Sequence, residues 1–168
     1  MIKKSERTTL LSTSDFEECQ KFDQWWLWSI IIIINIVSLW GLFQAVSLTE
    51  FLKNPSAHSE VWYTVLLLLG PLVLIYIIRL ETKINAHEVA IRFFPFINKK
   101  ILWSDIEHAE VIQYGFVGGW GIRIGTKYGT VYNTKGNIGL AIQLKNGKKY
   151  LIGTQQREQL NLLIEKLK

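Results

Sequence analysis

Cysteine is almost absent from this sequence, because Cys19 is the only one among 168 residues. A single thiol excludes a disulfide framework or a cysteine-based metal site within one chain, so we interpret Cys19 as an incidental thiol. The three histidines, His58, His87 and His108, lie far apart in the sequence, and none has a second ligand at metal-binding spacing. We therefore expect no metal and no other cofactor.

Charge is absent from two long stretches, although charged residues make up 20% of the chain. The first, Trp25–Val46, has 22 residues, and the second, Val61–Ile78, has 18. As a helix the first would measure about 33 Å, enough for a ~30 Å hydrocarbon core, and the second is at the short end of a spanning helix. These stretches exclude a soluble single-core protein and a disordered chain. They predict a transmembrane hairpin over residues 25–80, with helices at about 25–46 and 61–80.

Lysine and arginine are distributed unevenly around these stretches. Four precede the first stretch, one lies between the two, and fourteen follow the second. Positive residues are enriched on the cytoplasmic side of membrane proteins, so we expect both termini in the cytoplasm. Residues 1–24 would then be a polar cytoplasmic N-terminal segment, and residues 81–168 a cytoplasmic domain. The first stretch is too long, and follows too much polar sequence, for a cleaved signal peptide.

Two residues within the predicted hairpin affect its helices. Asn35 lies near the middle of the first stretch, where its amide would hydrogen-bond either a neighbouring helix or its own helix backbone. Pro71, after Gly70 in the second stretch, removes one backbone hydrogen bond and predicts a kink.

Short β-like runs broken by glycine, asparagine and proline follow Ile84. Asn146-Gly147 between two alternating runs predicts a hairpin in which both central residues take positive φ. At the end of the chain, apolar residues at Leu160, Leu163, Ile164 and Leu167 predict an amphipathic helix, with Thr154 as its N-cap. We therefore predict an α+β, mainly β domain: about seven antiparallel strands in a small barrel or sandwich, closed at one end by the helix. The candidate strands are Val89–Phe94, Lys99–Trp103, Ala109–Tyr114, Ile122–Ile124, Gly129–Tyr132, Leu140–Leu144 and Lys149–Gly153.

Several of these segments carry a resemblance to a known family. They are Thr82–Asn85, Arg92–Phe96, Trp103–Ile106, Gly118–Arg123, Lys145–Lys149 and Ile152–Gln155. With the two preceding apolar stretches, they resemble the bacterial pleckstrin-homology-like membrane proteins over nearly all of residues 25–168. The resemblance implies a seven-stranded pleckstrin-homology-like barrel with a C-terminal capping helix. It implies no established activity, because fold alone does not assign function.

A glycine-rich stretch within the domain is the leading candidate for a binding site. Its spacing does not match a dinucleotide fingerprint, and no Walker-type motif is present. It is either a loop that needs unusual φ angles or an exposed loop that presents aromatic rings to a partner or to the lipid interface. The candidate ligand- or partner-binding residues are Phe116, Gly118, Gly119, Trp120, Gly121 and Arg123.

Basic residues after the second apolar stretch are candidates for contact with the membrane surface. They are Arg79, Lys83, Arg92, Lys99 and Lys100. The turn Asn85–Glu88 lacks the lysine and arginine cluster with which eukaryotic pleckstrin-homology domains bind phosphoinositides, so specific phosphoinositide binding is not expected. No groove-entering helix or stacking motif indicates a nucleic-acid partner.

No catalytic constellation stands out in the sequence, so we expect a binding protein and not an enzyme. The sequence predicts a membrane-anchored, cytoplasm-facing binding or scaffolding module in a bacterial cytoplasmic membrane. It would recruit a protein or sense the lipid surface, and a homo-oligomer is possible. One alternative is a structural subunit that assembles through Asn35 and nearby small residues. A weaker one is an enzyme or transport component with a site at the junction of barrel and membrane, built from Arg123, Tyr132 and Asn137.

Overall fold

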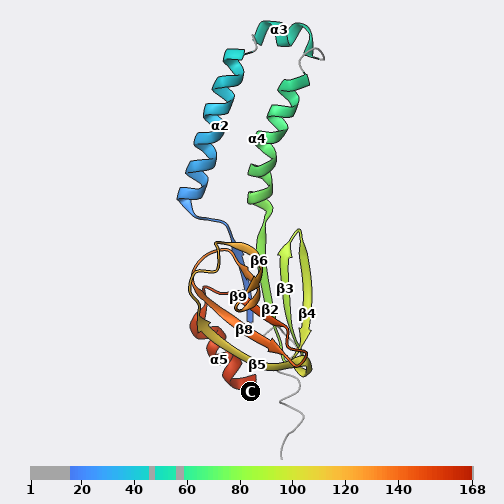
Figure 1. Ribbon diagram of the computed structural model, residues 1–168, viewed down its shortest axis with the longest axis vertical. Coiled ribbons are helices and arrows are strands. Elements are labelled where there is room, and N and C mark those ends of the chain that lie inside the picture. Colours follow the sequence, from blue (N-terminus) through green and yellow to red (C-terminus); the bar gives the residue numbers. More distant parts are fainter. Residues whose placement is uncertain (1–15, 46–47, 56–58, 168) are drawn as a thin grey trace, which may run out of the picture. The chain divides into compact units, whose positions relative to one another are not determined.

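The computed structural model describes residues 16–45, 48–55 and 59–167. It is an α+β structure that divides into two compact units (Figure 1). One is a helical unit, residues 22–77. The other, which we call the β-domain, comprises described residues 16–21 and 78–167. The helical unit is therefore an insertion within the sequence of the β-domain.

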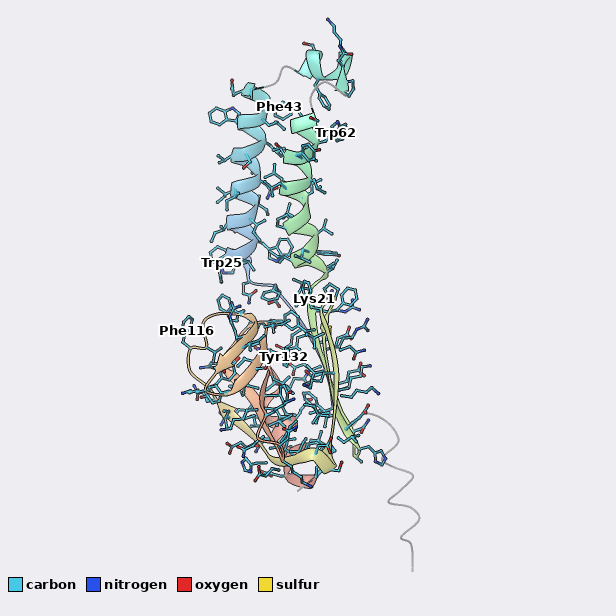
Figure 2. All side chains as sticks on the ribbon, turned by 45° about the vertical axis from the view of Figure 1, so that its right-hand side comes forward. Lys21, Trp25, Phe43, Trp62, Phe116 and Tyr132 are labelled. Atoms are coloured by element: carbon cyan, nitrogen blue, oxygen red, sulfur yellow. The ribbon has the colours of Figure 1, made fainter. Side chains whose placement is uncertain are left out.

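The helical unit contains α2 (Trp25–Ala45), α3 (Leu48–Lys53) and α4 (Ser59–Ile77). Both predicted stretches are helical, as α2 and α4, whereas α3 was not predicted. In the described part of the chain, only α2 is long and apolar enough to cross a membrane; the apolar part of α4, Val61–Ile77, is shorter. No residue of α2 is buried, and many apolar side chains of both long helices are exposed (Figure 2).

The structure shows the surroundings of Asn35 and Pro71 within the two helices. The Asn35 side chain donates a hydrogen bond to the Ile31 carbonyl at 2.8 Å, which is the intrahelical alternative. Helix α4 continues through Pro71 to Ile77. Asn35 therefore has a hydrogen-bond partner within its own helix.

Nine strands form two sheets in the β-domain, with the strand orders β1-β2-β3-β4 and β5-β8-β9-β7-β6. Every pair is antiparallel except β7 and β9, which run parallel. A 3-10 turn separates the two sheets, and α5 follows the last strand and packs against β1, β5 and β8. The elements are β1 (Phe16–Lys21), β2 (Arg79–Ile84), β3 (Glu88–Phe94), β4 (Ile97–Leu102), the 3-10 turn (Trp103–Asp105), β5 (Ile106–Gln113), β6 (Gly121–Thr126), β7 (Gly129–Asn133), β8 (Ile138–Leu144), β9 (Lys149–Gly153) and α5 (Arg157–Leu167).

The boundaries between the helical hairpin and the β-domain differ from the predicted boundaries at both ends of the hairpin. Residues 16–21 are not part of a separate N-terminal segment but form β1, which pairs with β2 from Phe16↔Ile84 to Lys21↔Arg79. Residues 79 and 80 belong to β2 and not to the hairpin. The β1–β2 ladder continues to the residues next to the helices, so strand pairing sets both boundaries.

Polar side chains fasten β1 to the C-terminal part of the β-domain. The buried Glu18 carboxylate accepts hydrogen bonds from the Thr154 hydroxyl at 2.6 Å and from the Gln155 backbone N–H at 2.8 Å. Gln20, also buried, donates to the Gly153 carbonyl at 2.7 Å and accepts from Thr134. The carboxylate lies just before α5, where a helix N-terminus favours negative charge. β1 therefore connects the first sheet to the end of the second.

Residues that alternate between buried and exposed positions along the strands form the core. In β3, Val89, Ile91 and Phe93 are buried while their neighbours are exposed or half-buried. Leu140, Ile142 and Leu144 alternate in the same way along β8, and Leu160, Leu163 and Ile164 are the buried face of α5. The predicted amphipathic helix is confirmed. Thr154 lies before it and accepts a hydrogen bond from the Gln156 N–H, although the helix begins at Arg157.

The predicted hairpin at Asn146-Gly147 is confirmed between β8 and β9, but its turn differs. The Gly147 N–H donates to the Leu144 carbonyl at 2.8 Å, so Lys145 and Asn146 are the central residues of that turn. Gly147 follows at φ +81°. This is the arrangement of a three-residue hairpin loop that ends with a left-handed glycine.

Candidate functional site

Two loops of the β-domain enclose a pocket of about 320 Å³. The first is the glycine-rich stretch between β5 and β6, and the second connects β7 to β8. We call this cavity the loop pocket. It is lined by Tyr114, Gly115, Phe116, Val117, Gly119, Trp120, Asn133, Gly136 and Asn137.

Tyr114 joins the two loops through its backbone and its side chain. Its N–H donates to the Asn137 carbonyl at 2.8 Å, and its hydroxyl donates to the Gly136 carbonyl at 3.3 Å. The Tyr114 ring is buried with Val131 and Leu151 in a small apolar cluster. Burial raises the pKa of the Tyr114 phenol, and the hydrogen bond from Asn133 opposes that rise. Tyr114 is therefore a neutral, fixed wall of the loop pocket.

The predicted glycines shape the first loop. Gly118, Gly119 and Gly121 have φ values of +87°, +110° and +104°. These are angles that residues with a Cβ rarely adopt. The expectation of a loop with unusual φ angles is confirmed, and the same loop forms one wall of the pocket.

Arg123 lies against this loop instead of lining the pocket. Its Nε donates to the Gly118 carbonyl at 3.1 Å and its Nη1 to the Ile122 carbonyl at 3.4 Å. A Cβ on Gly119 would stand 3.0 Å from Nη2 of Arg123, so the absence of a side chain there lets the guanidinium approach. The geometry makes Arg123 a positioning residue for the glycine-rich loop.

Phe116 and Trp120 are the aromatic rings that the sequence singled out, and both line the pocket. The Phe116 side chain is 91% exposed and lies at the outside of the β-domain, whereas Tyr132 lies within it (Figure 2). Trp120 is 38% exposed. The first loop therefore offers an apolar rim to whatever approaches the pocket.

Asn133 is a residue of this site that the sequence did not indicate. It ends β7 at 1% exposure, and its Nδ2 donates to the Tyr114 hydroxyl at 3.2 Å and to the Gly119 carbonyl at 3.4 Å. Its Oδ1 is buried and accepts no hydrogen bond from the residues that the structure describes. A single asparagine at a strand end carries no motif, so no sequence signal could have distinguished it.

The five basic residues proposed for the membrane surface are mostly paired within the β-domain. Arg79 and Arg92 both contact Glu81 and stack on the Phe94 ring, with 5.0 Å and 5.2 Å from each guanidinium carbon to the ring centroid. Lys83 pairs with Glu17, which together with Glu81 raises the Lys83 pKa, and Lys100 pairs with Glu88 at 2.8 Å. Lys99 donates to the Tyr150 hydroxyl and lies over its ring. Nearby carboxylates thus offset much of this positive charge.

The residues considered for an enzyme site do not come together in one pocket. Asn137 lines the loop pocket, whereas Arg123 and Tyr132 do not. Burial, followed by the neighbouring Tyr150, raises the Tyr132 pKa. Within residues 16–45, 48–55 and 59–167, no three histidine, cysteine or carboxylate side chains are grouped as a metal site would need. His58 lies outside the described residues.

A second, more polar pocket of about 300 Å³ lies elsewhere on the β-domain, and the sequence did not predict it. Its polar lining includes His108, Glu110, Lys127 and Lys149. His108 Nε2 lies 3.5 Å from Glu110, and the Lys127 ammonium lies over the Tyr128 ring. The loop pocket is the stronger candidate site, because the glycine-rich loop that the sequence singled out forms one of its walls.

Comparison with known proteins adds no further assignment: no protein-family model, no curated protein and no solved structure matches this chain.

Proposed function

We propose that the chain is a membrane-anchored binding module. In this proposal the helical hairpin crosses the bilayer twice, the β-domain is a pleckstrin-homology-like barrel on the cytoplasmic side, and the loop pocket receives the ligand or a partner's side chain. The observation that carries the proposal is the position of the hairpin, because it is inserted between two strands that pair with each other.

Strand pairing supports two crossings. Lys21 is paired with Arg79, three residues separate β1 from α2, and one residue separates α4 from β2. Three residues span at most about 11 Å, so both ends of the hairpin must start from the same side of a bilayer. A single crossing by α2 would separate two paired strands by the full hydrocarbon thickness.

The shorter helix is compatible with this topology. The 17 residues of Val61–Ile77 measure about 26 Å as a helix, a few ångströms below the usual core. Such a mismatch is absorbed at modest cost by local thinning or by oligomerisation. Trp62 and Tyr76, near opposite ends of α4, are exposed and are of the types enriched at membrane interfaces. The excess of lysine and arginine outside the loop between the helices favours cytoplasmic termini.

The strand order supports the pleckstrin-homology-like interpretation. If the β6–β7 hairpin is regarded as an insertion between β5 and β8, seven strands remain: β1–β4 in one sheet and β5, β8 and β9 in the other. They are followed by a helix, as the family resemblance implies. The candidate binding loop leads into this inserted hairpin, so the proposed site belongs to the insertion and not to the seven-stranded frame.

The chemistry of the loop pocket supports binding instead of catalysis. None of its lining residues is an acid, a base or a nucleophile that the structure activates. The structural-subunit alternative has weaker support, because the Asn35 amide is already bonded within its helix.

The topology can be tested with the native cysteine. Cys19 is an exposed free thiol on β1 and reports on the β-domain side. In spheroplasts that express the full chain, a membrane-impermeant maleimide should label Cys19 only after permeabilisation. Asn54→Cys in a Cys19→Ser background should react before permeabilisation, because residue 54 lies between the two helices. Labelling of Cys19 in intact spheroplasts, or protection of the cysteine at position 54, would contradict the proposal.

A further inference from the structure

We propose that the turn between β3 and β4 inserts the Phe96 ring into the headgroup region of the bilayer, as a lipid contact separate from the helical hairpin. This inference rests on the proposed function, because it takes the hairpin to cross the bilayer, and it names the surface of the β-domain that meets lipid. Strand register, exposure and charge at one end of the first sheet carry it.

Strand register places this turn at the end of the sheet where the chain leaves β1 and enters β2. Lys21, the last residue of β1, pairs with Arg79, the first of β2, and Arg79 pairs in turn with Phe94, the last of β3. We call this the entry end of the first sheet, and Lys21 marks it in Figure 2. Because β2 and β3 are antiparallel, the chain after Phe94 continues in the direction from which it enters β2. The Phe96 N–H closes the turn by donating to the Phe93 carbonyl at 2.8 Å.

The length of the connecting chain limits the distance of the entry end from the membrane. One residue separates α4 from β2, so Arg79 lies at most about 7 Å from the last residue of α4. In the proposed topology α4 ends at the boundary of the hydrocarbon core, and the headgroup region adds about 5–8 Å beyond it. The strand β3 lies about 5 Å to the side of β2. The turn at the end of β3 is therefore within reach of the headgroups.

The side chain at this turn is an exposed aromatic ring. Phe96 is 55% exposed, whereas Phe93, at the start of the same turn, is buried in the core. The exposed ring packs against little of the protein, so it would gain free energy by leaving water. Phenylalanine is also among the residues that enter the boundary between headgroups and acyl chains when a protein face lies on a membrane.

The charges around the entry end match an anionic lipid surface. The guanidinium groups of Arg79 and Arg92 lie over the Phe94 ring, and both contact Glu81. With Lys21, these residues comprise three cations and one carboxylate, which gives a net charge of +2 for the four charged groups. Lysine and arginine near the cytoplasmic leaflet are attracted to its anionic headgroups. An aromatic ring next to net positive charge therefore fits a lipid surface.

The inference divides the basic residues that the sequence grouped together. Lys83 and Lys100 both pair with Ala90, which lies four residues before Phe94 along β3. At about 3.4 Å per residue, these two lysines are about 14 Å from the entry end. We therefore assign the headgroup contact to the entry end and not to Lys83 or Lys100.

Short-range fluorescence quenching can test the contact. Phe96→Cys and Leu102→Cys, each in a Cys19→Ser background, carry an environment-sensitive label on the full chain, in nanodiscs of phosphatidylcholine and phosphatidylglycerol with nitroxide-labelled headgroups. Leu102 is the matched control, because it is 49% exposed and ends the same strand, about 20 Å from Phe96. The label at position 96 should lose at least about half of its emission to the nitroxide, and the label at position 102 should keep its emission. Equal quenching at the two positions, or none at position 96, would overturn the proposal.

A second probe keeps the native ring in place. Asn98 is exposed on β4, two residues after Phe96, so a label on Asn98→Cys should also be quenched. Adding Phe96→Ser should reduce that quenching, because the turn loses the side chain that enters the lipid, whereas adding Leu102→Ser should leave it unchanged. Quenching at position 98 that persists in full after Phe96→Ser would contradict the role of the ring.

A label in α2 separates this inference from the proposed function. Ile33 is 59% exposed in the middle of α2, and a label on Ile33→Cys should be quenched by nitroxides on the acyl chains. Quenching at position 33 without quenching at position 96 contradicts only the contact of the turn. An unquenched label at position 33 would show that the hairpin is not in the bilayer, and it would overturn the proposed function together with this inference.

Discussion

Ile33 in α2 and Ile91 in β3 are the same side chain in two different settings. Ile33 is 59% exposed, and no residue of α2 is buried, whereas Ile91 is 0% exposed within the β-domain. The β-domain removes its apolar side chains from water by packing them against each other. The helical unit leaves most of its apolar surface uncovered by protein, which is the arrangement that lipid, and not water, stabilises.

The same contrast applies to polar groups. In the β-domain, the buried Glu18 carboxylate receives its hydrogen bonds from residues more than a hundred positions away in sequence. In α2, Asn35 is satisfied four residues away within its own turn. The polar groups of the β-domain need long-range partners, whereas a polar group on an isolated helix can be satisfied locally. Substitutions in the two units should therefore differ in their effects on the stability of the β-domain.

The largest difference is expected from the two isoleucines. Ile91→Ala should lower the free energy of unfolding of the β-domain by about 2–5 kcal/mol, because it removes buried methyl groups and leaves a cavity. Ile33→Ala should leave that free energy unchanged. Hydrogen-exchange mass spectrometry of β-domain peptides in the full, detergent-solubilised chain measures both effects. Equal losses of protection in the two variants would mean that α2 packs as a protein core does.

Glycines give the next largest contrast. At Gly129, φ is +76° and a Cβ would stand 2.1 Å from the Lys149 carbonyl oxygen, so Gly129→Ala should cost the β-domain more than about 2 kcal/mol. Gly41 in α2 has no neighbour within 4 Å of an added Cβ, and alanine is the better helix former there by about 1 kcal/mol. Thermal unfolding followed by near-ultraviolet circular dichroism should show a lower transition for Gly129→Ala alone. A normal transition for that variant would show that the β7–β9 contact can open.

Much of the fold could be predicted from the sequence wherever a pattern is apolar and periodic. The face formed by Leu160, Leu163 and Ile164 indicated α5, and the charge-free runs indicated both long helices. β1 could not be predicted, because two of its three inward-facing residues, Glu18 and Gln20, are polar. An alternating pattern predicts a strand only when the buried face is apolar. The hydrogen bonds that permit their burial come from distant residues.

The candidate site was predictable in its loop but not in its chemistry. The glycine spacing and the two aromatic residues indicated a loop that forms one wall of the pocket. The opposite wall, with Asn133 and Gly136, comes from a different loop, and nothing in the sequence links the two. For the basic residues, a count of charges did not reveal that Glu17, Glu81 and Glu88 pair with four of the five.

Adjacent carboxylates in β1 sharpen the contrast between distant and local partners. Glu18→Ala leaves the Thr154 hydroxyl and the Gln155 N–H without their acceptor, and we expect a loss of about 1–3 kcal/mol in β-domain stability. Glu17→Ala, the matched control, removes an exposed contact with Lys83 and should have little effect. Asn35→Leu in α2 should have none. Urea unfolding gives the free energy of unfolding of each of the three variants. A Glu18 variant as stable as the Glu17 variant would mean that the hydrogen bonds from β1 do not stabilise the β-domain.

The smallest effect belongs to two buried tyrosines and depends on pH. Burial raises the pKa values of Tyr114 and Tyr132 above the ordinary value of 10.0. Above that pH the unfolded chain releases the phenolic protons while the folded β-domain retains them, so folding stability is complete below about pH 10 and declines as the pH rises further. Tyr114→Phe with Tyr132→Phe should make this decline shallower, even if the lost Tyr114 hydrogen bonds lower the stability at every pH. Unfolding measured at intervals from about pH 8 to pH 11 gives the two slopes. The difference between the two slopes reports on the tyrosines, and equal slopes would mean that neither phenol keeps its proton longer in the folded state.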